Sequence, residues 1–280
     1  MLDKVRPQIC PLLGAPMPTT VCWPDTNRVS KSGARVLEIL EWFSDNRRPA
    51  IAQEIAQVLG LPVSSAADLL KSLVETGHLL FDKDNKTYFP SPRVLRLSLS
   101  VLPYSMDSAG LSGIVRKLQA RTGACVSVSA QNGRHMQFVH ILPTPGVVLN
   151  EVHEGLKFPI VGTASGIAIL ATKADTDVIS LVRKATAGSA ARAREETIQS
   201  TLQQVRLARK RGYAVSFFDQ LQYAMSVAVT LNEPRAHYPL ALCAGGSKAN
   251  FQGREQDIAD IMRQVISDYL HAKGDASFAG

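Results

Sequence analysis

The stretch GLPVSSAADLLKSLVETGHLLFDKDNKTYFPSPRVLRLS, residues Gly60–Ser98, decides the fold of the first half of the chain. A helix is predicted from about Ser65 to Thr76, because apolar residues recur there at helical spacing: Leu69, Leu70, Leu73 and Val74. Two short strands, HLLFD and TYFP, then flank a turn over residues 83–86 that is rich in Asp and Asn. A helix followed by a hairpin is typical of a DNA-reading module.

Two further helices are predicted before this stretch. SKSGARVLEILEWF begins at Ser30, and either Ser30 or Ser32 can cap it, while AIAQEIAQVLG ends at Gly60. The residues expected to point into the core are Val36, Leu37, Ile39, Leu40, Phe43, Ile51, Ile55, Val58 and Leu59. Three helices and a hairpin predict a winged helix-turn-helix over residues 29–91.

The second half has a mixed pattern of helices and strands. SPRVLRLSLSVL predicts a linker helix over residues 92–110, and GIVRKLQARTG predicts the next helix. A hairpin about Asn132-Gly133, the apolar strands QYAMSVAVTL and YPLALCAGG, and long helices ending at Gly212 and near the C-terminus complete it. Helices beside a mostly antiparallel sheet indicate an α+β fold with a mixed α/β sensor domain over residues 111–280.

The first 28 residues carry no pattern of helix or strand. They contain five prolines and no uninterrupted apolar run of secretory type, so a flexible N-terminal arm is expected over residues 1–28. The four cysteines form no CxxC pair and no zinc-like cluster with histidine. No metal or other cofactor is therefore expected, and a reduced cytoplasm suits the chain; no apolar run is long enough to span a membrane.

The net charge of +7 indicates an anionic partner but is unevenly distributed. Residues 1–28 hold three cations and two anions, residues 29–100 hold nine and eight, and residues 101–280 hold nineteen and fourteen. The predicted DNA-binding module is thus nearly neutral. DNA binding of modest strength per protomer is expected, so that oligomerisation is needed for useful affinity.

The order of these motifs resembles the IclR family of bacterial transcription regulators over about residues 29–272. The similarity rests on GARVLEILEWF, RRPAIAQEIAQVLGLPVSSAADLLKSLVETGHL and PRVLRLS in the first half, and on FPIVGTASGIAILA, ARKRGYAV and ALCAGG in the second. The resemblance implies a winged helix-turn-helix, a linker helix and a GAF-like domain that binds small effectors. It also implies a homodimer or homotetramer on double-stranded operator DNA.

The third helix is predicted to lie in the major groove with its start facing the base edges. Asp68 stands where the resembling family usually has a basic residue, so the contacts to phosphate must come from cations around it. An alternative role for Ser65 is to cap the helix, with Asp68 completing a loose capping box. The residues expected to contact DNA are Arg47, Arg48, Ser64, Ser65, Asp68, Lys71, Lys83 and Lys86.

The resemblance places an effector between the sheet and the start of the helix that carries GTASG. Amides and a hydroxyl at that helix start would suit a carboxylate, although a tightly packed start with no ligand is the alternative. Met225 falls where many family members have cysteine, and Gly245 where many have serine. The expected contacts are Gly162, Thr163, Ala164, Phe217, Asp219, Tyr223, Met225, Cys243 and Gly245.

Several of these residues are aromatic or apolar, so the pocket is expected to prefer a small apolar or aromatic metabolite, with one acidic group allowed. In the alternative, Phe217 and Phe218 are core or close the pocket. The predicted function is that of a ligand-responsive DNA-binding regulator, which is expected to control a catabolic gene cluster. Two alternatives stay open: a sensor with degenerate DNA binding that acts through protein contacts, and an enzyme that uses Cys243. No catalytic motif supports an enzyme.

Overall fold

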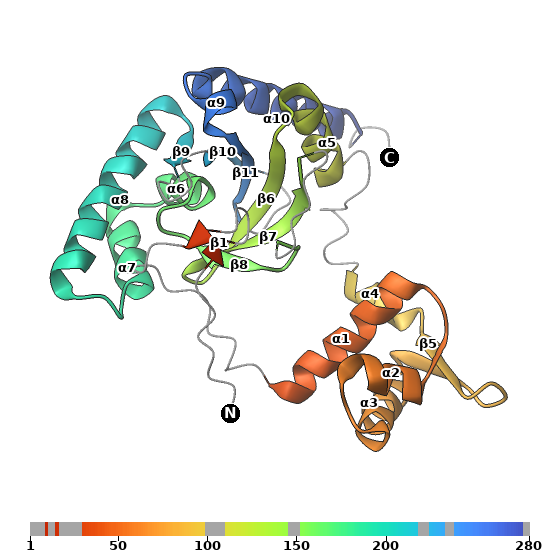
Figure 1. The fold of residues 1–280 in the computed structure, drawn as a ribbon. Helices are drawn as coiled ribbons and strands as arrows, with labels where there is room; N and C mark the ends of the chain where they lie inside the picture. Colours follow the sequence, from red (N-terminus) through yellow and green to blue (C-terminus); the bar gives the residue numbers. More distant parts are fainter. Residues whose placement is uncertain are drawn as a thin grey trace. The chain divides into compact units, whose positions relative to one another are not determined.

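The chain divides into two compact units, Asp25–Pro103 and a larger one that contains Tyr104–Gly280 (Figure 1). The computed structural model describes residues 9–10, 15–16, 30–98, 110–144, 152–217, 224–232 and 238–276. No helix among these residues is both long enough and apolar enough to cross a membrane.

The first unit is a winged helix-turn-helix. Its helices are α1 (Lys31–Asn46), α2 (Ala52–Leu59), α3 (Val63–Glu75) and α4 (Arg93–Ser98). Its antiparallel sheet has the order β3-β5-β4, with β3 at Ala50–Ile51, β4 at Leu79–Asp82 and β5 at Thr87–Pro90. The predicted wing hairpin is confirmed, and β3 adds a third strand that the sequence did not predict.

Local signals set the ends of these helices. Ser30 caps α1, because its hydroxyl accepts a hydrogen bond from the Gly33 amide at 3.4 Å. Gly60 ends α2 in the left-handed conformation at φ 61°, which a residue with a β-carbon adopts only at a cost. Only Gly60, Leu61 and Pro62 separate α2 from α3, so the two helices are joined by the tight turn that a helix-turn-helix requires.

The core of the first unit confirms most of the apolar residues predicted to face inward. Ile39, Phe43, Ile55, Leu70 and Leu73 are buried together. Three predicted core residues are instead exposed: Leu37 at 60%, Val58 at 54% and Ile51 at 43%.

Each of these three errors has a geometric reason. Leu37 lies one residue outside the stripe of Val36, Ile39, Leu40 and Phe43, which has the spacing of a buried helical face. In α2 the small residue Ala56 is buried instead of Val58. Ile51 points outward because its neighbour in β3, Ala50, takes the inward position of the alternating strand.

The second unit is built on a six-stranded antiparallel sheet with the order β8-β7-β6-β11-β10-β9. In chain order the strands are β6 (Cys125–Asn132), β7 (His135–Leu142), β8 (Lys157–Pro159), β9 (Ala214–Phe217), β10 (Ala224–Leu231) and β11 (Leu240–Ser247). This arrangement confirms the predicted α+β fold.

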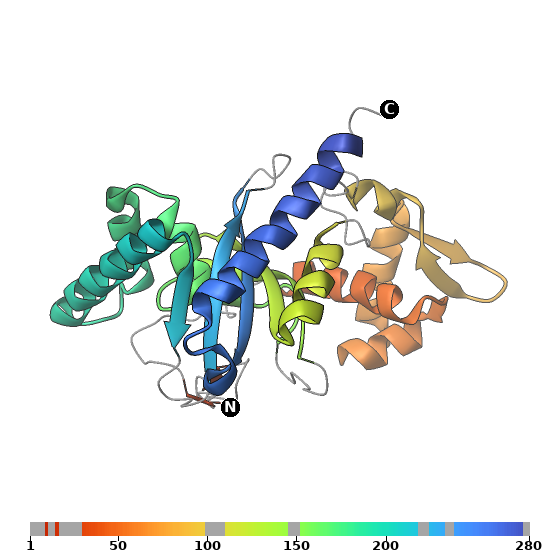
Figure 2. The same ribbon diagram turned by 90° about the horizontal axis from the view of Figure 1, so that it is seen from above.

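Helices cover both faces of this sheet (Figure 2). One face packs against α5 (Leu111–Thr122) and α10 (Glu255–Ala276), and α9 (Lys248–Phe251) adjoins β10 and β11. The other face packs against α6 (Ala164–Ala171), with α7 (Asp175–Ala185) and α8 (Ala191–Arg211) outside it. The helix α7 was not predicted from the sequence.

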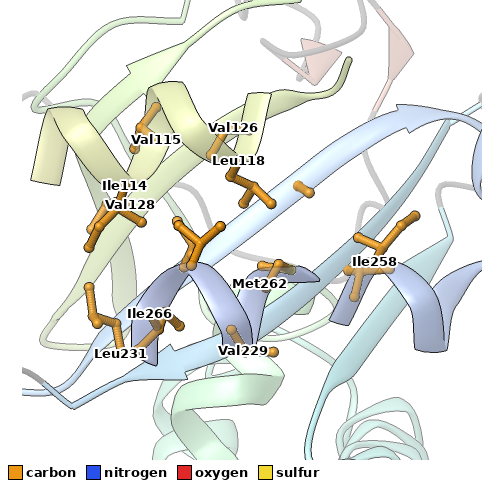
Figure 3. Close-up of a cluster of buried hydrophobic side chains, with 14 of the residues drawn as sticks. Ile114, Val115, Leu118, Val126, Val128, Val229, Leu231, Ile258, Met262 and Ile266 are labelled. Atoms are coloured by element: carbon orange, nitrogen blue, oxygen red, sulfur yellow. The ribbon is translucent and has the colours of Figure 1, made fainter. Parts of the chain in front are cut away.

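Alternation along β6 distributes side chains between the two layers. Val126 and Val128 join Ile114 and Leu118 of α5 in the cluster that Figure 3 shows, to which α10 contributes Ile258, Met262 and Ile266. Ser127 and Ser129 point to the α6 face and are also buried. The alternating pattern of β6 is therefore real, but its polar positions face a second protein layer and not water.

A small hairpin lies in the segment predicted as a flexible arm. β1 (Ile9–Cys10) pairs with β2 (Ala15–Pro16) in antiparallel register. The rest of residues 1–28 lies outside the described part of the chain. The predicted linker helix over 92–110 is described only as α4 and at residue 110, since residues 99–109 also lie outside it.

Candidate DNA-binding surface and effector site

The outward face of α3 is the candidate DNA-binding surface. Ser64, Ser65, Asp68 and Lys71 are all exposed, whereas Ala66, Leu70 and Leu73 on the other side of the helix are buried. The residues expected to face DNA thus do face solvent, at the start of the second helix of the motif.

Ser65 does not cap this helix, so that alternative interpretation is wrong. The helix begins two residues earlier than predicted, at Val63, and the N-cap position is Pro62, which makes no side-chain capping bond. Proline suits the residue before a helix start, because its fixed φ is compatible with the turn from α2. The hydroxyls of Ser64 and Ser65 are therefore in the first turn and exposed, free of a capping role.

Arg48 is less available to DNA than its position in the sequence suggested. Its guanidinium forms a two-pronged ion pair with the Glu54 carboxylate and lies 5.2 Å from the centre of the Trp42 ring. The hydrogen bonds from Arg48 lower the pKa of Glu54. Arg48 therefore ties the end of α1 to α2, while Arg47 beside it is exposed at the left-handed C-cap of α1.

The wing places two more cations at the surface. Lys83 and Lys86 are exposed in the turn between β4 and β5, and Lys86 has a φ of 54°. Asp82 holds the turn, because its carboxylate accepts hydrogen bonds from the Asp84 and Asn85 amides at 2.9 and 3.2 Å. A hydrogen bond from the Asn85 side chain, together with these two bonds from the amides, lowers the pKa of Asp82.

The start of α6 is the candidate effector site, and its polar groups are bonded within the protein. The Thr163 hydroxyl accepts from the Gly166 amide at 3.2 Å and donates to the Pro159 carbonyl at 3.0 Å. The Ala164 amide donates to the Ser216 hydroxyl at 3.0 Å. This corresponds to the tightly packed helix start of the alternative interpretation. A carboxylate would have to displace Ser216 in order to reach Ala164.

Close packing also explains why glycine follows in the GTASG motif. A β-carbon at Gly166 would lie 1.8 Å from the Ile160 carbonyl oxygen, which no real contact allows. Gly162, by contrast, has open space around it and a φ of 77°, so its requirement is conformational. The two glycines therefore serve different purposes: Gly162 turns the chain out of β8, and Gly166 lets α6 approach that turn.

The sheet face under α6 presents a thiol among hydroxyls. Cys243 lies beside the hydroxyls of Ser127, Ser165 and Ser226, which partly offset the rise of its pKa, and Gly245 pairs with Ser226 across the strands. Cys243 and Gly245 therefore lie on the predicted side of the sheet. The serines were not predicted from the sequence, because only the register between β6, β10 and β11 places them on the same side as Cys243.

Met225 and Phe217 lie on the opposite face of the sheet, so their predicted place in this site is wrong. Met225 is fully buried in the cluster beneath α5 and α10. Phe217 is its cross-strand partner and is 51% exposed. The reason is a one-residue parity error, because Ser216 and Ser226 occupy the positions that face α6. Asp219 and Tyr223 lie outside the described residues.

The cysteines of this site have the properties of protonated thiols. Burial raises the pKa of Cys243 to about 11 and that of Cys125 to about 12. A nucleophilic cysteine needs the opposite shift, so neither thiol is prepared for catalysis. Within the described residues no group of three or more His, Cys, Asp or Glu side chains could hold a metal ion.

A chain of polar contacts joins α5 to β7 on the other face of the sheet. The Nε2 atom of His140 lies 3.4 Å from the Ser112 hydroxyl oxygen, and its Nδ1 atom lies 2.5 Å from the Glu154 carboxylate. This sequence of serine, histidine and carboxylate resembles a catalytic triad, but Ser112 is only 3% exposed. A substrate carbonyl cannot reach that hydroxyl in this arrangement, and the contact serves to hold α5 on the sheet.

Comparison with known proteins matches both units. The family model described as IclR helix-turn-helix domain matches residues 32–83, and the model described as Bacterial transcriptional regulator IclR C-terminal matches residues 109–269. The HTH-type transcriptional regulator XynR of Escherichia coli K12 is 23% identical over 242 residues, covering 85% of this chain and 93% of that protein.

Solved structures show the same fold. An IclR of Thermotoga maritima has a TM-score of 0.56 at 20% identity, covering 85% of this chain and 96% of its own. An IclR homologue of Microbacterium hydrocarbonoxydans, complexed with 4-hydroxybenzoate, has a TM-score of 0.56 at 18% identity, covering 85% and 97%. With one family model spanning more than half of its length, the chain belongs to the IclR family of bacterial transcriptional regulators, which pair a DNA-binding helix-turn-helix with an effector-binding domain.

Proposed function

We propose that this regulator binds operator DNA through the outward face of α3 and the wing between β4 and β5. The observation that supports this most is the separation of the two sides of α3: Ser64, Asp68 and Lys71 are exposed, while Ala66 and Leu70 are buried. A rigid helix whose polar side is free, directly after a tight turn, has the geometry that enters a major groove.

The charges of this unit limit how strongly it binds any duplex. Two of its arginines are already used, since Arg35 pairs with Glu38 and Arg48 with Glu54. Exposed cations near the predicted surface are Arg47, Lys71, Lys83 and Lys86. Four phosphate contacts per protomer give a slope of about −4 in a plot of log affinity against log salt concentration.

Binding to the promoter region of its own gene, measured by fluorescence anisotropy across salt concentrations, tests this proposal. The full-length protein should prefer that duplex over random DNA at low ionic strength, with the modest slope given above. No preference at low ionic strength would refute it and would favour a sensor that acts through protein contacts. A much steeper slope per protomer would refute the assigned cations.

The effector proposed for the second unit is a small aromatic or apolar metabolite with one polar or acidic group, held between α6 and the sheet. Supporting it are the stacked rings of Phe138 and Phe158, 4.4 Å apart in the apolar layer under α6, and the hydroxyls around Cys243. The related protein complexed with 4-hydroxybenzoate makes hydroxylated aromatic acids the first candidates.

Thermal melting with a panel of aromatic and aliphatic acids tests this effector class. A ligand that binds only the folded state raises the melting temperature, by an amount that grows with its concentration relative to its Kd. Stabilisation by aromatic acids is expected. Stabilisation only by small hydroxylated aliphatic acids would contradict the assigned class.

The working form proposed is a homodimer or a dimer of dimers in the cytoplasm, controlling a catabolic gene cluster without enzymatic activity. The winged unit has almost no net charge, so a single copy is expected to bind DNA weakly. This supports oligomerisation, because two linked DNA-binding units bind DNA with a higher affinity than one. The raised pKa values of Cys243 and Cys125 weigh against a cysteine-dependent enzyme. Light scattering coupled to gel filtration should give a mass of two or four chains, and a monomer on operator DNA would contradict this.

A further inference from the structure

Asp68 occupies the middle of the outward face of α3. Helical geometry places it one turn after Ser64 and three residues before Lys71, opposite the buried residues Ala66 and Leu73. Glu75, in the last turn, is also exposed. The face that would meet DNA therefore offers two carboxylates and one ammonium group, an unusual balance for a surface that approaches phosphates.

The Asp68 carboxylate has no structural task in the described part of the chain. Helix capping is ruled out because Asp68 lies in the second turn of α3. Its backbone carbonyl accepts a hydrogen bond from the Ser72 hydroxyl at 2.8 Å, but no ion pair or hydrogen bond engages its side chain among the described residues. The carboxylate is thus free to accept hydrogen bonds from a partner.

The chemistry of the major groove leaves one base that a carboxylate can read well. Guanine presents two acceptors there, thymine an acceptor and a methyl group, and adenine a donor next to an acceptor. Each acceptor repels the charged oxygens of a carboxylate. Cytosine alone presents its amino donor without an adjacent acceptor, so it is the base that matches Asp68.

We propose that Asp68 selects a cytosine in each half-site, accepting a hydrogen bond from its amino group. This inference rests on the proposed docking of α3 in the major groove. Lys71, three residues further along the same face, is placed to contact the phosphate backbone beside that base pair, so it positions α3 while Asp68 reads the base. The carboxylate lowers the affinity for all duplexes by repelling phosphates, and it restores affinity only where the cytosine is present.

Selection of binding sites from a library of randomised duplexes tests this role. The full-length protein is compared with Asp68→Asn and with the matched control Glu75→Gln, which removes the same charge from the last turn of α3. The wild type should select cytosine at one position of the half-site, favouring it at least about fivefold over other bases. Glu75→Gln should keep this preference while binding all sequences more tightly.

The asparagine variant should lose the cytosine preference and shift toward adenine, because an amide both donates and accepts as adenine requires. A melting curve confirms that each variant is folded, as expected for exposed positions. An unchanged base preference in Asp68→Asn would overturn the inference while leaving the proposed function intact. If the wild type selects no sequence at all, the proposed function itself fails, and the two failures are thereby distinguishable.

Discussion

Replacing Gly166 by alanine should destabilise the effector-binding unit more than any ordinary surface change. The added β-carbon would meet the Ile160 carbonyl oxygen at 1.8 Å, whereas real contacts of this kind stay beyond 3.0 Å. The two groups must therefore separate by at least 3.0 − 1.8 = 1.2 Å. The Ile160 oxygen belongs to the backbone and the backbone fixes the position of a β-carbon, so a rotamer change cannot relieve the clash.

The same displacement breaks the bonds that begin α6. Overpacking of this kind costs about 1–3 kcal/mol, and each lost hydrogen bond adds about 1 kcal/mol. Two bonds of Thr163 are at stake, from the Gly166 amide at 3.2 Å and to Pro159 at 3.0 Å. The sum is about 3–5 kcal/mol, which lowers the melting temperature of a unit of this size by roughly 6–20 °C.

Differential scanning calorimetry of the full-length protein measures this effect. Gly188→Ala is the matched control, because a β-carbon there meets nothing within 4 Å and the residue has no positive φ. The control should melt within about 2 °C of the wild type. If Gly166→Ala melted with the control, the close approach of α6 to Ile160 would not be a constraint, and the packed helix start described above would be refuted.

Three further predictions concern a core leucine, an ion pair and two cysteine thiols. Leu70→Ala should destabilise the winged unit by about 2–5 kcal/mol, since Leu70 is fully buried. Leu37→Ala, at an exposed position, should change the midpoint of urea unfolding little. Equal effects of the two substitutions would contradict the assigned core. Hydrogen bonding to Arg209 lowers the pKa of Asp175 in the folded protein. The stabilisation by this pair is therefore complete above the unfolded pKa of about 4, and it is lost as the pH falls through the lower pKa of the folded state. Asp175→Asn should therefore flatten the decline of the urea midpoint between about pH 5 and pH 2, and an unchanged slope would count against the pair. Burial raises the pKa of Cys243 to about 11 and that of Cys125 to about 12. Iodoacetamide at pH 8 should therefore label Cys243 about a hundredfold and Cys125 about a thousandfold more slowly in the folded protein than in urea, as followed by mass spectrometry. Rapid labelling in the folded state would mean that these thiols are not buried as described.

The helices and strands of this chain were largely readable from local signals. Ser30 and Gly60 mark the ends of helices because capping and left-handed φ depend on residues within one turn. The period of the apolar residues identified β6, β10 and β11 as strands, and the order of motifs identified the family. These features depend on short-range geometry that the sequence states directly.

What the tertiary structure decided is which side of each element meets which partner. Strand period alone cannot say whether Met225 or Ser226 faces α6; pairing with β9 and β11 fixes that choice, and a shift of one residue reverses it. Likewise, the sequence shows that Arg48 is a cation, but it does not show that Arg48 forms an ion pair with the Glu54 carboxylate. The start of α6 looks like an anion site in sequence, yet Ser216, fifty-two residues beyond Ala164, already occupies its amide. Such contacts join residues far apart in the chain, so they are fixed only when the sheet and its helices pack together.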